Sequence, residues 1–296
     1  MTITIQSLNK RRAAGTPVTM MTAYDFLTAR ACDTHGVDMI LCGDSLAQVC
    51  LGYDSTSRLT LDEMIHHCRA VARGASAPFL VGDLPFGSYF RGPNDTVAAA
   101  VRMLQEGHAE GVKMEGGIEL VDSVRALTRI GIPVMAHVGL TPQRHTALSG
   151  YRVQGRTAQG AREILHAALA LEDAGAFSIV LEAIPHELGA YITSRLKIPT
   201  IGIGAGPWTS GQVLVYDDVM ATWLGHKAKF VRRFADVRGE VQKGITSFVD
   251  AVKDGSFPSM EEESYVWVLS GCVAGSEVRS KMEPLIWVSE KMTATR

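Results

Sequence analysis

The chain has 296 residues, of which 46% are hydrophobic and 20% are charged. This length is sufficient for one large core, since α/β barrels of about 250 residues fold as single domains. The 29 Lys and Arg residues nearly balance the 31 Asp and Glu residues, so the formal net charge is −2. This balance disfavours nucleic acid and anionic membranes as partners and leaves a small molecule as the expected ligand.

The cysteines and the apolar segments indicate where the protein works. The five cysteines are odd in number and form no CxxC pair, so we expect free thiols in a reducing compartment. No apolar run approaches the roughly 18 residues that a membrane span needs, and the basic residues 10–12 are not followed by the apolar stretch of a secretory signal. We therefore expect a cytoplasmic protein that does not cross a membrane.

One pattern recurs along the chain: a short apolar run stops at Gly, Asp, Glu or His, and a segment with helical periodicity follows. Near-continuous apolar runs are typical of parallel strands that are buried on both faces. Eight such runs occur, at residues 17–24, 37–43, 78–83, 111–115, 133–138, 177–182, 199–204 and 213–216. Helix start and stop signals bound the intervening segments 60–74, 93–107 and 157–175. Eight strands alternating with helices form a closed (β/α)₈ TIM barrel or a doubly wound sheet, and the count favours the barrel.

Polar residues stand at the carboxyl ends of several of these runs. Barrel active sites lie at this end of the strands, because the loops that follow the strands converge there. Carboxylates gathered in one mouth would repel each other unless a cation or a shared proton relieved them. Oxygen ligands without a thiolate suit Mg²⁺. The residues concerned are Asp44, Asp83, Lys113, Glu115, His137 and Glu182.

Strand order suggests a role for most of these side chains. Asp44, Asp83 and Glu115 belong to strands two, three and four, so we expect them to bind the ion, whereas Glu182 on strand six would face it as a general base. Lys113 stands two residues before Glu115 and shares its strand face. Any one of these carboxylates could instead cap a helix or pair with a loop residue.

Three further features are less specific. His137 could contact the substrate or be a hydrogen-bonded core histidine, and the sequence leaves both open. The longest irregular insert, residues 139–156, could be a lid or cofactor wall, or a surface excursion. The glycine-rich segment 202–206 lacks the G-x-G-x-x-G spacing, so we reject a dinucleotide site.

Several stretches, all in one register, resemble the ketopantoate hydroxymethyltransferase family, also called 3-methyl-2-oxobutanoate hydroxymethyltransferase. The likeness runs in order from about residue 3 to residue 265, which is far more specific than any single motif. The matching stretches are MTAYD (21–25), VDMILCGDS (37–45), DLPF (83–86), VKMEGG (112–117), HVGLTPQ (137–143), GYRVQG (150–155), LE (181–182) and IGIGAG (201–206).

The resemblance implies a barrel of the phosphoenolpyruvate/pyruvate-utilising type in a cytoplasmic homo-oligomer, commonly a decamer. It implies hydroxymethyl transfer from 5,10-methylenetetrahydrofolate to 3-methyl-2-oxobutanoate, through a Mg²⁺-stabilised enolate, giving 2-dehydropantoate in pantothenate biosynthesis. Carried over position by position, the resemblance assigns Asp44, Asp83 and Glu115 as metal ligands, Asp44, Ser45, Asp83 and Lys113 as 2-oxo acid contacts, and Glu182 as the proton acceptor.

The family pattern ends before the chain does. We predict a single barrel domain over residues 1–265, while residues 266–296 match no family motif. An oligomer contact, a disordered tail and an altered reading frame all remain open for them. Two alternative functions also remain: another Mg²⁺ barrel enzyme that handles 2-oxo acid enolates, such as a C–C lyase or a phosphonopyruvate-type mutase, and a catalytically silent scaffold.

Overall fold

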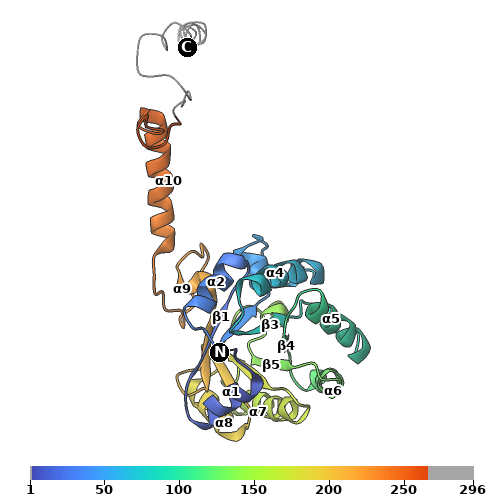
Figure 1. Ribbon diagram of the computed structural model, residues 1–296. Helices are drawn as coiled ribbons and strands as arrows, with labels where there is room; N and C mark the ends of the chain where they lie inside the picture. The colour runs from blue at the N-terminus through green and yellow to red at the C-terminus, as the bar shows by residue number, and fades with distance from the viewer. Residues whose placement is uncertain (1, 266–296) are drawn as a thin grey trace, which may run out of the picture. The chain divides into compact units, whose positions relative to one another are not determined.

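The computed structural model describes residues 2–265, and the chain divides into two compact units, Met1–Arg238 and Gly239–Arg296. The first unit is a closed barrel of eight parallel strands, each paired with the next along the chain, and the last pairs with the first (Figure 1). The predicted barrel is confirmed, and the alternative of a doubly wound sheet is wrong. The strands are β1 (Val18–Thr22), β2 (Met39–Cys42), β3 (Phe79–Asp83), β4 (Gly111–Glu115), β5 (Val134–Gly139), β6 (Ser178–Glu182), β7 (Thr200–Ile203) and β8 (Gly211–Leu214).

All eight predicted strands are present. The bounds of β4 are those predicted, whereas β8 begins and ends earlier than the predicted run 213–216. Every residue of β2, β3 and β4 is buried. This is the pattern expected of parallel strands that are covered on both faces.

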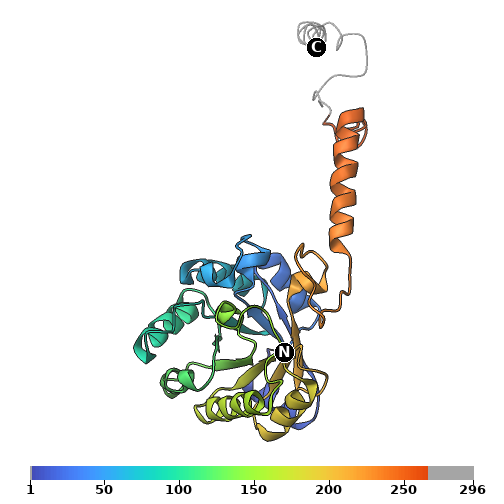
Figure 2. The same cartoon turned by 180° about the vertical axis from the view of Figure 1, so that it is seen from behind.

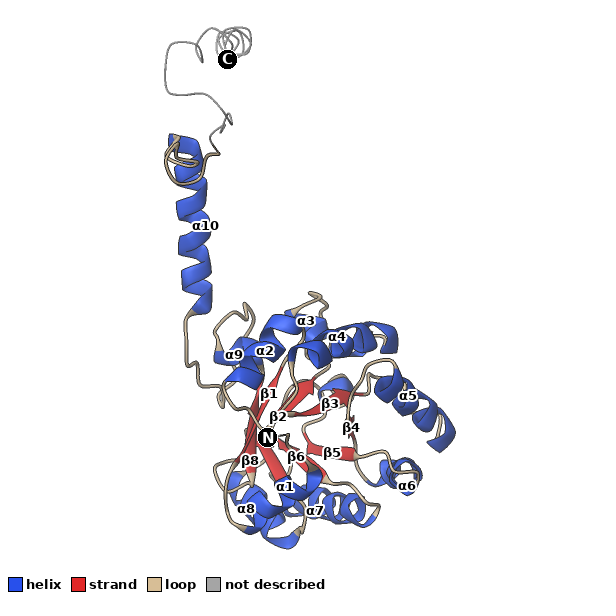
Figure 3. Cartoon of the chain, viewed as in Figure 1, coloured by secondary structure: helices blue, strands red, loops and turns tan. Residues whose placement is uncertain are grey.

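Helices surround the strands of the first unit (Figures 2 and 3). The predicted helices at 60–74, 93–107 and 157–175 correspond to α4, α5 and α7. At the start of α4, Thr60 accepts a hydrogen bond from the Glu63 backbone N–H, and the Glu63 carboxylate accepts one from Thr60, which is a capping box. In the described part of the chain no helix separates β7 from β8. The helices of this unit are α1 (Ile5–Ala13), α2 (Phe26–Thr34), α3 (Leu46–Val49), α4 (Leu61–Gly74), α5 (Pro93–Gln105), α6 (Val121–Arg129), α7 (Ala158–Asp173), α8 (His186–Arg195) and α9 (Tyr216–Val219), with 3₁₀ turns η1 (Thr56–Arg58), η2 (Ile118–Leu120) and η3 (Pro142–Arg144).

Side chains that point into the barrel form an apolar layer, and polar residues follow it toward the carboxyl ends of the strands. Phe79, Val81 and Val180 belong to one buried cluster inside the barrel. Because strand side chains alternate between faces, the next inward position after Phe79 and Val81 is Asp83. By the same alternation Glu182 follows Val180. Both carboxylates therefore point into the barrel at the carboxyl ends of its strands.

The second unit contains all but the first two residues of α10 (Val237–Asp254). None of the residues of α10 is buried, and its large apolar side chains recur at helical spacing, since Val241, Ile245, Phe248, Val249 and Val252 are all exposed. The alternatives raised for residues 266–296 lie outside the described residues.

Two sequence expectations can be compared with the described chain. Its four cysteines are free, and Cys32, Cys42 and Cys68 are buried, as expected for thiols that pack as small hydrophobic side chains. None of its helices has both the length and the apolar character that crossing a membrane requires.

Candidate active site

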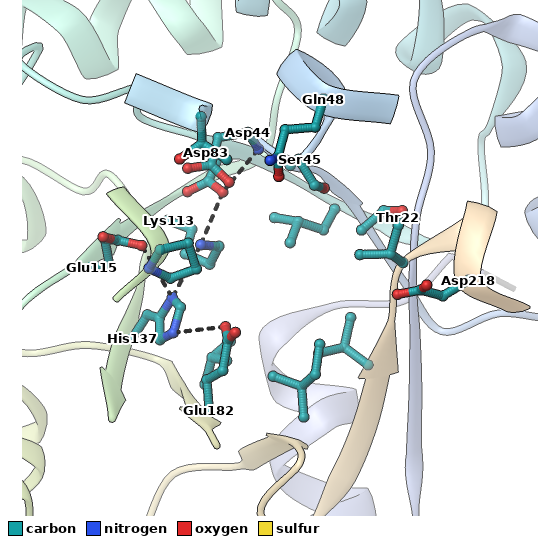
Figure 4. Close-up of a pocket in the computed structure, with 18 of the residues that line it drawn as sticks. Thr22, Asp44, Ser45, Gln48, Asp83, Lys113, Glu115, His137, Glu182 and Asp218 are labelled. Carbon is teal, nitrogen blue, oxygen red and sulfur yellow. Dashed lines mark hydrogen bonds and ion pairs between the residues drawn. The ribbon is translucent and has the colours of Figure 1, made fainter. Parts of the chain in front are cut away.

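A cavity of about 180 Å³ lies at the carboxyl ends of the strands. The structure brings every residue that the sequence singled out for the site into its lining, from β3, β4, β5, β6 and the loop after β2 (Figure 4). These residues are Asp44, Ser45, Asp83, Lys113, Glu115, His137 and Glu182.

Asp83 and Lys113 form a buried ion pair at the centre of this cluster. The pairing register places them side by side on β3 and β4, and Lys113 Nζ lies 2.9 Å from Asp83 Oδ2. The backbone N–H of Asp44 donates to the same oxygen at 3.2 Å. The other oxygen, Asp83 Oδ1, is buried without a hydrogen-bond partner among the described residues. Because such an atom is costly to bury, it marks a position where a ligand would bind.

Gln143, in the insert after β5, is a site residue that sequence reasoning missed. Its side-chain Nε2 donates to Asp44 Oδ2 at 2.9 Å, and its backbone N–H donates to Glu115 Oε1 at 2.9 Å. The hydroxyl of Tyr89 donates to Gln143 Oε1 at 2.7 Å. Gln143 is neutral and does not end a strand, so it was not selected by the search for polar residues at the carboxyl ends of apolar runs. The available signal was its place in the long insert, residues 139–156.

His137 connects the ion pair to Glu182. Burial, followed by the charge of Lys113, lowers the pKa of His137, so its ring is neutral near pH 7. His137 Nδ1 lies 3.3 Å from Lys113 Nζ, which can only donate, so Nδ1 accepts and Nε2 carries the proton. Nε2 lies 3.2 Å from Glu182 Oε2, although the N–H is not aligned as in a full hydrogen bond. The proton therefore faces Glu182.

The backbone is strained directly after Glu182. Ala183 has a φ of 46°, a left-handed conformation that costs a residue with a Cβ on the order of 1 kcal/mol or more. Two backbone hydrogen bonds hold it: Ala183 N–H donates to Ile203 O at 2.8 Å, and Gln154 N–H donates to Ala183 O at 2.9 Å. Strain maintained in this way at a strand end supports a functional role for this position.

The rest of the cavity is largely apolar. Ser45, which follows Asp44, has its Oγ 2.8 Å from the Tyr24 hydroxyl. Thr22 and Asp218 lie across the cavity from the acidic cluster (Figure 4). Of the alternatives raised for the insert, a lid or wall of the site agrees with the position of Tyr151, which lines the cavity. The apolar lining consists of Leu41, Pro142, Val180, Ile203, Val213, Val215 and Phe230.

The electrostatics of the cluster show a shortage of positive charge. Burial raises the pKa of Asp83 to about 7, with Lys113 opposing the shift and Asp44 adding to it. Burial and the charge of Asp44 raise the pKa of Glu115 well above its usual value. Burial disfavours the charged form of Lys113, but the carboxylates of Asp83, Asp44 and Glu115 outweigh this effect and raise its pKa. A bound cation would allow these carboxylates to ionise together.

The side chains suit a hard cation that keeps part of its water shell. Asp44, Asp83 and Glu115 share the cavity, but within residues 2–265 no group of three or more His, Cys, Asp or Glu side chains is arranged so that it could by itself hold a metal ion. Mg²⁺ is usually held by one or two carboxylates together with waters and substrate oxygens. The three predicted ligands therefore fit a partly hydrated ion better than a cage made of protein alone.

Solved structures share this fold. They include a phosphonopyruvate hydrolase complex with oxalate and Mg²⁺ (TM-score 0.58, 18% identity, covering 99% of this chain and 98% of that one). Another is 2,3-dimethylmalate lyase, a member of the PEP mutase/isocitrate lyase superfamily (TM-score 0.56, 18% identity, 97% and 100%). These likenesses concern the fold alone, and they agree with the predicted barrel type.

Closer relatives are found among curated sequences. The 3-methyl-2-oxobutanoate hydroxymethyltransferase of Oleidesulfovibrio alaskensis is 51% identical over 253 residues, covering 86% of each chain. The enzyme of that name from Emericella nidulans is 46% identical over 265 residues, covering 89% of this chain and 76% of that one. The family model described as ketopantoate hydroxymethyltransferase matches residues 2–260. This chain therefore belongs to the ketopantoate hydroxymethyltransferase family.

Proposed function

We propose that this chain transfers a hydroxymethyl group to C3 of 3-methyl-2-oxobutanoate, the reaction after which its relatives are named. One observation carries the proposal: the Lys113–Asp83 pair and Glu182 line a single cavity whose remaining wall is mainly apolar. The polar side suits the carboxylate and keto oxygens of a 2-oxo acid. The apolar side suits its branched alkyl group. Glu182 would then lie beside the carbon that joins the two.

We propose Mg²⁺ as the cation of this site. The unpartnered Asp83 Oδ1 and the raised pKa of Glu115 support a positive charge between them. Asp44, Asp83 and Glu115 would hold the ion, directly or through water. When bound, Mg²⁺ polarises a keto oxygen and lowers the energy of negative charge that forms there, by several kcal/mol.

In the proposed mechanism Glu182 removes the proton from C3. Its carboxylate lies 3.2 Å from Nε2 of His137, which does not itself react. The Lys113 ammonium stabilises the negative charge that develops on the keto oxygen as the enolate forms. The electron pair left on C3 then bonds to the methylene carbon of the donor, as the bond from that carbon to one of its two nitrogens breaks and this nitrogen takes up the proton held by Glu182. Water then adds its oxygen to the same carbon as the second carbon–nitrogen bond breaks, and the proton released from water goes to that nitrogen.

We propose 5,10-methylenetetrahydrofolate as the one-carbon donor. Aromatic rings at the cavity support this choice, because planar heterocycles stack on them. Tyr151 lines the cavity, is 55% exposed, and stacks on His145 with an angle of 7° between the rings. Phe230 is a second partly exposed ring in the lining. The product, 2-dehydropantoate, would be used in pantothenate biosynthesis.

The Glu182→Gln variant tests the proton step. It should bind Mg²⁺ and 3-methyl-2-oxobutanoate but lose the exchange of the C3 proton with deuterium, followed by NMR. Glu187→Gln on the exposed surface of α8 is the matched control and should exchange normally. Normal exchange in Glu182→Gln would remove Glu182 from its role as general base.

A second variant tests the ion. Asp83→Ala should abolish Mg²⁺-dependent binding of the 2-oxo acid, measured by calorimetry. Undiminished binding would contradict the ligand assignment.

The competing functions make different predictions. A lyase or mutase of the same fold would cleave or rearrange its substrate without folate, whereas the family match favours the transferase. A silent scaffold would have no need of a complete acidic cluster beside a buried lysine. Consumption of the 2-oxo acid that requires folate indicates the transferase. Consumption without folate indicates a lyase or mutase, and no consumption indicates the scaffold.

We also propose that the protein works in the cytoplasm as a homo-oligomer, for which the decamer implied by the resemblance is the expected size. Ile245 and Phe248 lie exposed on α10, and contact with another subunit would remove these apolar side chains from water. The buried free thiols support a reducing location. Sedimentation equilibrium would measure the size, and a monomer at micromolar concentration would contradict the assembly.

A further inference from the structure

We infer that Gln143 is a positioning residue, held by Tyr89, that orients Asp44 and Glu115 toward the cation. Gln143 and Tyr89 are both buried, with 3% and 1% of their surface exposed. Neither residue is among those that line the cavity, so any effect on the ion passes through the two carboxylates. The inference rests on the proposed metal-assisted function.

The neighbours of the Gln143 amide fix its direction. Its Nε2 lies 2.9 Å from Asp44 Oδ2 and 3.1 Å from the carbonyl oxygen of Leu84. An ionised carboxylate and a carbonyl can only accept hydrogen bonds. On the other side, Oε1 accepts from the Tyr89 hydroxyl at 2.7 Å. A flipped amide would place its oxygen against two acceptors, so the observed orientation is strongly favoured.

Each carboxylate of the cluster uses one oxygen for a protein donor. Asp83 Oδ2 receives the Asp44 backbone N–H and Lys113, Asp44 Oδ2 receives the side chain of Gln143, and Glu115 Oε1 receives the Gln143 backbone N–H. For the remaining oxygen of each carboxylate, the described residues provide no hydrogen bond. Gln143 alone thus serves two of the three carboxylates, and it leaves one oxygen of each for the ion.

The hydroxyl of Tyr89 completes the arrangement. Besides Gln143 Oε1, it lies 3.2 Å from the backbone oxygen of Glu115. Its ring is buried beside Phe90, with 4.7 Å between ring centroids. Mutation of a residue that orients metal-binding carboxylates in this way typically lowers metal affinity by about 10–100-fold.

The Gln143→Leu variant isolates the side-chain contact. It removes the donor to Asp44 but keeps the backbone N–H that serves Glu115. We expect the affinity for Mg²⁺, titrated calorimetrically with 3-methyl-2-oxobutanoate present, to fall about 10–100-fold. The kcat at saturating Mg²⁺ should stay near that of the wild type. Tyr89→Phe keeps the ring and should give a smaller loss in the same direction.

A double-mutant cycle shows whether Gln143 acts through Asp44. In an Asp44→Asn background, titrated to high millimolar Mg²⁺, Gln143→Leu should lower the affinity by less than about twofold. If the loss of Mg²⁺ affinity in the double variant equals the product of the losses in the two single variants, the inference is overturned. Gln154→Leu is the matched control, because it makes the same substitution in the same insert, where the side chain donates to Arg152 O. It should leave Mg²⁺ affinity unchanged.

The outcomes separate this inference from the proposed function. If the wild-type protein binds no Mg²⁺ with the 2-oxo acid, the proposed function fails. If the wild type binds Mg²⁺ but folded Gln143→Leu binds it within about twofold of wild type, the positioning role is overturned and the function stands. Urea unfolding of each variant shows that it is folded. A loss of stability with unchanged Mg²⁺ affinity would assign Gln143 a structural role and also overturn the inference.

Discussion

Replacing Lys113 with methionine removes the ammonium group that neutralises the centre of the acidic cluster. Lys113 and Asp83 are 4% and 1% exposed, and their charged atoms lie 2.9 Å apart. Breaking a buried ion pair by removing one partner costs about 3–5 kcal/mol, because the other group is left buried without its partner. Methionine keeps most of the apolar stem. In a unit of this size each kcal/mol lowers Tm by about 2–4 °C, so we expect a decrease of roughly 6–20 °C.

The assay is thermal and urea unfolding in EDTA near neutral pH, together with turnover. Arg102→Met is the matched control, since it breaks ion pairs with Asp62 and Glu106 that are exposed to solvent, and exposed pairs contribute little. Lys113→Met should also lose turnover, because it lacks the charge proposed to stabilise the enolate. A decrease in stability no larger than that of the control would refute the reasoning about the buried pair.

Three other predictions test different parts of the account. Asp38, at the amino-terminal end of the barrel, is buried and pairs with Arg11, so Asp38→Ala should cost about 2–3 kcal/mol in urea unfolding without changing Mg²⁺ affinity; a changed affinity would argue against separate ends for stability and function. Gly139 has a φ of 99°, and a Cβ there would collide with the Glu182 carbonyl oxygen, so Gly139→Ala should lower Tm and slow C3 proton exchange, and normal values of both would contradict this. Burial raises the pKa of Asp83 to about 7 from a usual value of about 3.9, so its contribution to stability in EDTA is full below about pH 4 and is lost as the pH rises through about 7. Asp83→Asn should abolish this contribution, and a difference in urea midpoint between wild type and variant that does not vary with pH would contradict it.

The strands and the charged residues of the site were predictable because they follow simple rules. Strands buried on both faces must be apolar, so the runs that became β1 to β8 stood out from their surroundings. The side-chain period of two then assigns Asp83 and Glu182 to the inward face. Closure of the barrel brings such strand ends together, as the shared cavity shows.

Other parts of the site depend on contacts that no local pattern reports. Gln143 meets Tyr89 and Asp44 across 54 and 99 positions of the chain, and this requires the particular path of the insert. The left-handed backbone of Ala183 is imposed by its neighbours and not by its own side chain. The bounds of β8 were harder to predict, because the strand contains polar residues and no helix separates it from β7 in the described chain.

The most direct measurement of the central claim is turnover of 3-methyl-2-oxobutanoate with 5,10-methylenetetrahydrofolate, with Mg²⁺ and with EDTA. The account predicts formation of 2-dehydropantoate when both the folate and the ion are present, and none when either is left out. Sustained product formation in EDTA, or without the folate, would contradict it.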